Sequence, residues 1–273
     1  MSRLILESGR TERQYWRDLW NYRELFYVLA WRDISVRYKQ TVVGVLWAFL
    51  QPFLTSVVVT LIFGKLAHLA TAGGPPYFLV VFAAMMPWQF FANSLTTSSQ
   101  SLVSNASLIS KVYFPRMIIP ASAVVTAMVD FLISFSIMIA AMVWYQYWPT
   151  WRFLTLPGFI FVALVATLGP GLFITALNVK YRDFRFVVPF LVQIGFFVSP
   201  VCFPSSKIPE EWRLLYSLNP MVGVIDGFRW AILGGESRIY LPGFFLSLEA
   251  TVALTWLGIR YFRSTERTFA DVI

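Results

Sequence analysis

The stretch MIIPASAVVTAMVDFLISFSIMIAAMVW, residues 117–144, decides the class of this fold. Its only charged side chain is Asp130. A hydrocarbon core ~30 Å thick needs about 20 helical residues, because the backbone polar groups must be satisfied within the helix. This stretch is therefore long enough and apolar enough to cross a membrane.

Other apolar stretches have the same character. Together with the first, they predict six transmembrane helices at residues 41–64, 77–98, 117–144, 153–178, 186–203 and 240–262. Hydrophobic residues make up 58% of the 273 residues and charged residues only 13%, which leaves little polar chain for a soluble catalytic core. We expect an all-α integral membrane protein with cytoplasmic segments at 1–40 and 263–273 around a transmembrane domain at 41–262.

Basic residues are divided unequally between the two sides that six spans create. Sixteen of the 22 Lys and Arg fall on the side of both termini, which the positive-inside rule makes the cytoplasm. The net charge of +8 then reflects topology and contact with anionic membrane lipids. Nucleic-acid binding is not expected, because no basic stretch accompanies a recognition fold.

Two segments on the cytoplasmic side have helical character outside the spans. Residues 21–40 mix aromatic side chains with Arg and predict an interface helix, the alternative being a plain linker. A polar run extends the second span into the cytoplasm and leads into a coupling helix at about 104–116. That segment carries a short apolar patch, which indicates either a partner surface or a loop packed on itself: Leu108, Ile109, Val112 and Phe114.

Between the fifth and sixth spans, residues 209–234 predict two short helices. Asn219-Pro220 is an N-cap followed by proline at the first helical position, and Gly234 ends the helix. From 220 to 233 such a helix is only about 20 Å long at 1.5 Å per residue, too short to cross. We expect re-entrant helices that dip into the outer leaflet.

Two carboxylates, Asp130 and Glu249, lie inside predicted spans, where charge is costly enough to indicate function. Asp130 belongs to a stripe with Ser122, Thr126 and Ser134, spaced every four residues. Such a face either lines a pore or packs helices together. Prolines interrupt several spans, which fits a bundle around a cavity as well as simple kinking.

The inventory of motifs excludes several kinds of chemistry. His68 is the only histidine, Cys202 is the only cysteine, and neither H-E-x-x-H nor a Gly-rich phosphate loop occurs. No catalytic or metal site is expected. The chain therefore needs a separate subunit if its work is driven by nucleotide hydrolysis.

The chain resembles the permease subunits of type-2 ABC exporters, in the branch that moves lipid-linked polysaccharides such as O-antigen, capsule and teichoic acid. The resemblance runs from about residue 25 to 273. It rests on the order and spacing of these residues: Trp31-Arg-Asp33, Arg37-Tyr38, Gly44, Trp47, Pro52, Phe114-Pro-Arg116, Pro120, Tyr181-Arg-Asp183, Ser199-Pro200 and Asn219-Pro220.

The resemblance implies a bacterial inner-membrane protein that is half of a pore. In such exporters two permease copies form a homodimer, and two ABC ATPase subunits bind the ATP and press on the interface and coupling helices. No cofactor is then held by this chain. The substrate would be a polysaccharide on a polyprenyl diphosphate, exported for lipopolysaccharide or capsule biosynthesis.

Three groups of residues are candidates for roles in such a cycle. The lipid diphosphate is expected at the basic residues Arg32, Arg37 and Lys39, whose alternative role is contact with membrane headgroups. The pore or glycan-stacking candidates are Trp47, Phe53, Trp88, Phe91, Phe197 and Asp130. The ATPase-coupling candidates are Asn105, Leu108, Lys111, Phe114 and Arg116.

Three other functions remain open from the sequence. An ABC exporter of drugs or small lipids shares the pore architecture. A membrane enzyme acting on lipid-linked glycans would need a cluster of acidic or histidine side chains at one face. A scaffold would not need prolines that shape a cavity or carboxylates inside the membrane.

Overall fold

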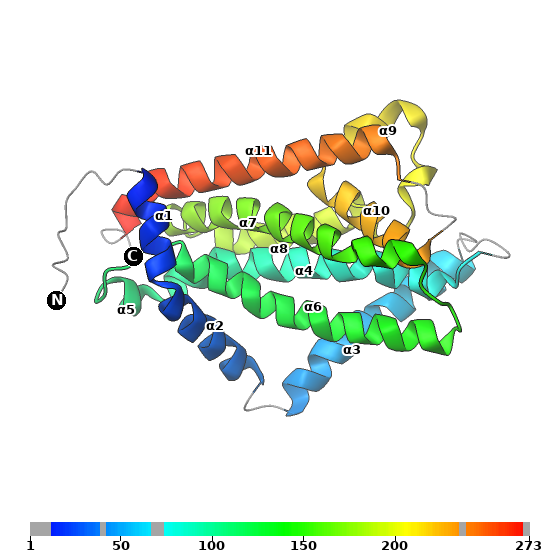
Figure 1. Cartoon of the computed structure of the whole chain (residues 1–273), viewed down its shortest axis with the longest axis horizontal. Helices are drawn as coiled ribbons and strands as arrows, with labels where there is room; N and C mark the ends of the chain where they lie inside the picture. Colours follow the sequence, from blue (N-terminus) through cyan, green and yellow to red (C-terminus); the bar gives the residue numbers. More distant parts are fainter. Residues whose placement is uncertain (1–11, 39–41, 67–73, 235–238, 270–273) are drawn as a thin grey trace.

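A computed structural model of the chain describes residues 12–38, 42–66, 74–234 and 239–269. Within these ranges the protein is built from helices and connecting loops, with no strand (Figure 1). The α-helices are α1 (Glu12–Asn21), α2 (Arg23–Tyr38), α3 (Val42–Val59), α4 (Tyr77–Ser104), α5 (Ala106–Ile109), α6 (Ile118–Trp144), α7 (Leu156–Lys180), α8 (Phe184–Val198), α9 (Glu210–Tyr216), α10 (Pro220–Leu233) and α11 (Leu241–Thr265).

Four helical segments of the described chain are long and apolar enough to cross a membrane. They are Tyr77–Ser104, Ile118–Trp144, Trp151–Lys180 and Leu241–Thr268, where the third includes a 3₁₀ turn before α7 and the fourth a 3₁₀ turn after α11. The protein is thus a multi-pass membrane protein.

The other two expected spans, 41–64 and 186–203, correspond to shorter apolar helices, Phe49–Gly64 and Phe184–Val198. The α8 helix stops before Pro200 because the residue preceding a proline is driven out of the helical region, and Ser199 is indeed extended, with φ −91° and ψ 156°. The length that the sequence predicts for the fifth span is therefore not reached by a continuous helix.

The long helices α4, α6, α7 and α11 run along the length of the bundle (Figure 1), and α4 packs against α6, α7 and α10. The polar run at the end of α4 does not face solvent throughout, because Thr175 and Asn178 of α7 donate hydrogen bonds to the carbonyls of Ser98 and Ser99, at 2.8 and 2.7 Å. These serines are buried and form a polar seam between helices.

Helices α7 and α11 cross at two glycines. A Cβ atom added to Gly258 would lie 2.1 Å from the carbonyl oxygen of Gly169, so only glycine fits there. Beside this crossing, the hydroxyl of Thr255 donates to the carbonyl of Val165 at 3.0 Å. The pair of helices is held by close backbone approach rather than by large side chains.

Different short helices lie at the two ends of the bundle (Figure 1). We call them the α9 end, which carries the short helices α9 and α10, and the α1 end, which carries α1 and α5. At the α9 end, the N-cap Asn219 accepts a hydrogen bond from the backbone N–H of Met221 at 3.0 Å and donates to Ser199 Oγ at 2.9 Å. The two short helices occupy the segment in which the sequence predicts them.

A buried arginine connects α10 to neighbouring segments through hydrogen bonds. Arg229 is 3% exposed and donates hydrogen bonds to the backbone carbonyls of Val80, Val201 and Phe203, at 3.1, 2.8 and 3.1 Å. Two of these carbonyls, those of Val201 and Phe203, belong to the irregular chain after α8, where no helix supplies a partner. The α9 end is thereby tied to α4.

Candidate functional site

A charged cluster joins α2 to α6. The Arg37 guanidinium lies 2.7 Å from Asp130 Oδ2, and the Tyr38 hydroxyl donates a hydrogen bond to Asp130 Oδ1. Burial, the largest cause, and this hydrogen bond raise the pKa of Tyr38, so its phenol stays protonated and serves as donor. Asp130 thus has two partners from a single helix.

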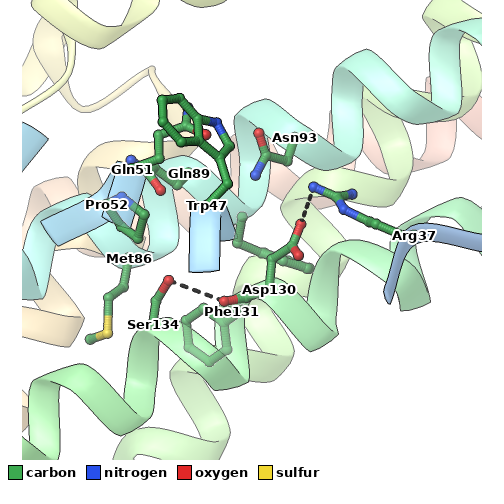
Figure 2. Close-up of a pocket in the computed structure, with 11 residues that line it drawn as sticks. Arg37, Trp47, Gln51, Pro52, Met86, Gln89, Asn93, Asp130, Phe131 and Ser134 are labelled. Carbon is green, nitrogen blue, oxygen red and sulfur yellow. Dashed lines mark hydrogen bonds and ion pairs between the residues drawn. The ribbon is translucent and has the colours of Figure 1, made fainter. Parts of the chain in front are cut away.

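This cluster faces a cavity of about 170 Å³ between α2, α3, α4 and α6 (Figure 2). Its lining is mixed in character: Arg37, Trp47, Gln51, Pro52, Met86, Gln89, Phe90, Asn93, Asp130, Phe131 and Ser134. Side-chain amides are contributed by two helices, Gln51 by α3 and Gln89 with Asn93 by α4. Such amides can both donate and accept hydrogen bonds.

The polar stripe of α6 divides between packing and the cavity. Ser122, Thr126, Asp130 and Ser134 are all buried, and Ser122 and Thr126 bond back to carbonyls of their own helix. Asp130 and Ser134 line the cavity (Figure 2). One part of the stripe therefore packs within the bundle and another part borders the cavity. Glu249, by contrast, is exposed on α11.

The structure gives different partners to Arg32 and Arg37, two of the three basic residues that the sequence groups at the lipid diphosphate. Arg37 reaches the cavity, and Lys39 lies outside the described residues. Arg32 instead bonds Asp33 at 2.8 Å and the side-chain oxygen of Asn105 at 2.9 Å. It therefore links α2 to the end of α4, next to the expected coupling segment.

The aromatic candidates do not gather in one place. Trp47 is 58% exposed and lies beside the cavity, whereas Trp88 is 5% exposed and packs against Phe91 and Phe196. A Cβ atom on Gly195 would lie 2.7 Å from the Trp88 ring. Within the single chain, Trp88 belongs to the hydrophobic core.

The remaining two aromatic candidates lie at the surface of the single chain. Phe53 stacks on Phe49 with ring centroids 6.3 Å apart, and Phe197 is largely exposed on α8. Neither ring lines the cavity. Exposed rings on membrane helices contact lipid or another subunit.

The coupling candidates divide between the surface and the interior. Lys111 is exposed and Leu108 is partly buried, but Phe114 is 3% exposed and packs in a core cluster at the α1 end. Ile109 lies in the same cluster. The side chains of Phe114 and Ile109 are therefore packed inside the protein, because the ends of the long helices enclose them. This matches the alternative in which the segment packs on the protein itself.

Arg116, the last coupling candidate, has a partner that the sequence did not indicate. Its guanidinium donates to the backbone carbonyl of Glu266, and its backbone N–H donates to Glu266 Oε1 at 2.7 Å.

The amides of the cavity were also missed, because single Gln and Asn residues in apolar helices carry no spacing signal. A search for polar side chains on the α3 and α4 faces would have found them.

Comparison with known proteins defines the family. The ABC-2 type transporter family matches residues 24–233. This chain belongs to the ABC-2 type transporter family. It is 31% identical to the O-antigen export system permease protein RfbA of Myxococcus xanthus, over 94% of this chain and 98% of that protein.

Two other relatives of the ABC-2 chain are named for capsule-type polymers. One is the polysialic acid transport protein KpsM of Escherichia coli, which is 24% identical over 86% of this chain and 91% of that protein. The other is the capsule polysaccharide export inner-membrane protein CtrC of Neisseria meningitidis, which is 24% identical over 85% of this chain and 87% of that protein. The chain is thus a transmembrane subunit similar over most of its length to polysaccharide export permeases.

Proposed function

We propose that this ABC-2 chain is the membrane subunit of an ATP-driven exporter that moves a polysaccharide linked to polyprenyl diphosphate, such as O-antigen or capsule, across the bacterial inner membrane. The observation that carries the proposal is the nearly full-length similarity to three permeases named for O-antigen, polysialic acid and capsule export. The similarity to the first of these covers 94% of this chain, and the family match spans residues 24–233.

In this proposal both termini are cytoplasmic and six segments cross the membrane, with α3 and α8 as the first and fifth. Large apolar side chains are exposed on both shorter helices, including Leu54 and Val58 on α3 and Phe186, Phe190 and Phe197 on α8. A second copy of the chain would cover part of these surfaces, and lipid the rest. Two copies then enclose one pore.

Two ABC ATPase subunits hydrolyse ATP in this cycle and act on the loop between α5 and α6. Lys111, Val112 and Tyr113 are exposed at its tip. Exposed apolar side chains outside the membrane, such as Val112 and Tyr113, favour contact with a partner subunit. The chain itself contributes no catalytic residue and no cofactor.

The cavity supplies the groups that such a substrate needs. Arg37 offers a cation for the diphosphate, the amides of Gln51, Gln89 and Asn93 suit sugar hydroxyls, and Trp47 offers an apolar ring face. Because Arg37 is paired with Asp130, a diphosphate would have to share or replace that carboxylate. Arg37 would then contact the diphosphate while the substrate is bound and pair with Asp130 after the substrate leaves.

Depletion of the chain in its host tests the function. We expect loss of surface polysaccharide together with accumulation of polyprenyl-linked glycan inside the cell, both reversed by a plasmid-borne copy. Unchanged surface and internal glycan would contradict the proposal and favour an exporter of drugs or small lipids.

A further inference from the structure

The segment between α5 and α6 is held at its base by the far end of the chain. The backbone N–H of Arg116 donates to Glu266 Oε1 at 2.7 Å, and the Arg116 guanidinium donates to the backbone carbonyl of Glu266. These two residues are 150 positions apart in sequence, and each supplies one side-chain and one backbone group. The contact joins the start of α6 to the end of α11.

A third helix closes over this contact. Tyr15 of α1 is enclosed beside Glu266, and burial, then the negative charge of Glu266, raises the pKa of Tyr15 so that its phenol stays neutral. The Arg263 guanidinium carbon lies 4.8 Å from the centre of the Tyr15 ring. The Glu266 carboxylate is therefore shielded from water on the side of α1.

Apolar packing surrounds the polar contact. Phe269, which follows Glu266 by one helical turn, is 1% exposed and stacks edge-on against Phe262 with ring centroids 5.3 Å apart. Both rings share a core cluster with Phe114 and Ile109 of the coupling segment. Residues 266–269, which continue directly from α11, thus pack on the base of that segment.

The geometry has a mechanical consequence. The exposed tip, Lys111 to Tyr113, stands on a loop without regular structure whose base is fixed by Phe114 and Arg116. A loop anchored only to its own helices would absorb a push at the tip by bending. Because the base is bonded to α11, and α11 packs along α7 and α10, displacement of the base must carry the long helices with it.

We propose that Glu266 is a positioning residue for energy coupling, which locks the base of the 110–116 segment to α11 so that both move as one unit. The proposal rests on the proposed function, since it assumes an ATPase that presses on this segment. The locking itself is a property of the chain and is measurable without transport.

Hydrogen exchange of the complex of this chain with its ATPase tests the locking. In Glu266→Ala the amides of 110–117 should exchange faster by about tenfold, the factor expected when a hydrogen bond to a charged acceptor is lost. Glu266→Gln keeps an acceptor oxygen and should stay close to wild type. The matched control is Glu249→Ala, which removes an exposed carboxylate from the same helix. Unchanged exchange in Glu266→Ala would overturn the proposal.

Export from proteoliposomes, measured together with ATP hydrolysis, tests the coupling. Glu266→Ala should hydrolyse ATP at close to the wild-type rate while glycan export falls by about tenfold. A parallel fall of hydrolysis and export would indicate a merely structural role and overturn the coupling. If the wild-type complex exports no glycan, the proposed function fails, and the exchange experiment alone decides whether the lock exists.

A cross-link gives a second test that does not depend on the stability of Glu266→Ala. The paired substitutions Arg116→Cys and Glu266→Cys place two thiols at these positions, and oxidation joins them where their Cα atoms approach within about 7 Å. If the two positions move as one unit, the oxidised protein should export at the rate of the wild type. Loss of export on oxidation, restored by reduction, would show that they must separate and would overturn the proposal.

Discussion

Arg37 and Asp130 form an ion pair, with 2.7 Å between Nη2 and Oδ2, that connects α2 to the transmembrane helix α6. The carboxylate side chain is 10% exposed and the guanidinium side chain 38% exposed, so the pair lies at the wall of the cavity rather than in open solvent. One residue was expected to bind the lipid diphosphate and the other to line a pore. The fold places the two side chains together at the wall of one cavity.

Removing the cation should affect both stability and transport. Among the described side chains, Arg37→Ala leaves Tyr38 as the partner of the buried Asp130 carboxylate. We expect this variant to be less stable by about 1–3 kcal/mol, less than for a fully buried pair because Arg37 is partly exposed. Thermal unfolding in detergent measures this cost. Export should fall at equal protein level, and wild-type export by Arg37→Ala would contradict a role in binding the diphosphate.

Two tryptophans from the candidate group should behave differently. Trp88→Ala empties a packed site against Phe196 and Gly195 and should cost about 3–5 kcal/mol, with reduced protein in the membrane. Trp47→Ala, at an exposed position beside the cavity, should leave protein level unchanged and lower export. Immunoblots and surface glycan assays distinguish them, and normal export by Trp47→Ala would place that ring in lipid.

The glycine crossing of α7 and α11 gives a sharp stability prediction. Gly258→Ala places a methyl group 2.1 Å from the carbonyl oxygen of Gly169, so the helices must separate, at a cost of about 1–3 kcal/mol. Gly158→Ala is the matched control, because no atom lies within 4 Å of its added Cβ. Thermal unfolding of both purified variants checks the difference, and equal unfolding temperatures would refute the close crossing.

The coupling segment should separate into a binding residue and a core residue. Lys111→Glu changes an exposed tip and should weaken co-purification with the ATPase while leaving the unfolding temperature unchanged. Phe114→Ala removes a ring that is 3% exposed and should cost about 3–5 kcal/mol. Full recovery of the ATPase with Lys111→Glu would show that the tip is not the contact.

The family, the membrane location and the positions of most helices could be predicted from the sequence because they depend on local composition and spacing. The apolar run at 117–144 appears as α6, and the Asn219-Pro220 signal appears as the start of α10. The fifth span was overestimated because hydrophobicity continues past Ser199, whereas the helix ends at the proline.

The individual residues of the candidate site could be predicted from the sequence, but their arrangement could not. Arg37, Trp47 and Asp130 were identified by charge and residue type, but their proximity was not, because it depends on how α2 and α3 cross α6. Trp88 and Phe114 were chosen as aromatic residues at suggestive positions, and the structure buries both. Burial of a ring in a membrane helix depends on neighbouring helices, which periodicity does not specify.

The helical membrane fold and the ABC-2 family follow from the amino-acid sequence, because the length of an apolar run and the order of motifs are properties of the chain itself. Tertiary structure alone decided the partners of the polar groups: Asp130 with Arg37, Arg229 with the carbonyls beyond α8, and Glu266 with Arg116. A buried polar group needs a partner. Which distant residue supplies it follows from the packing of helices in three dimensions.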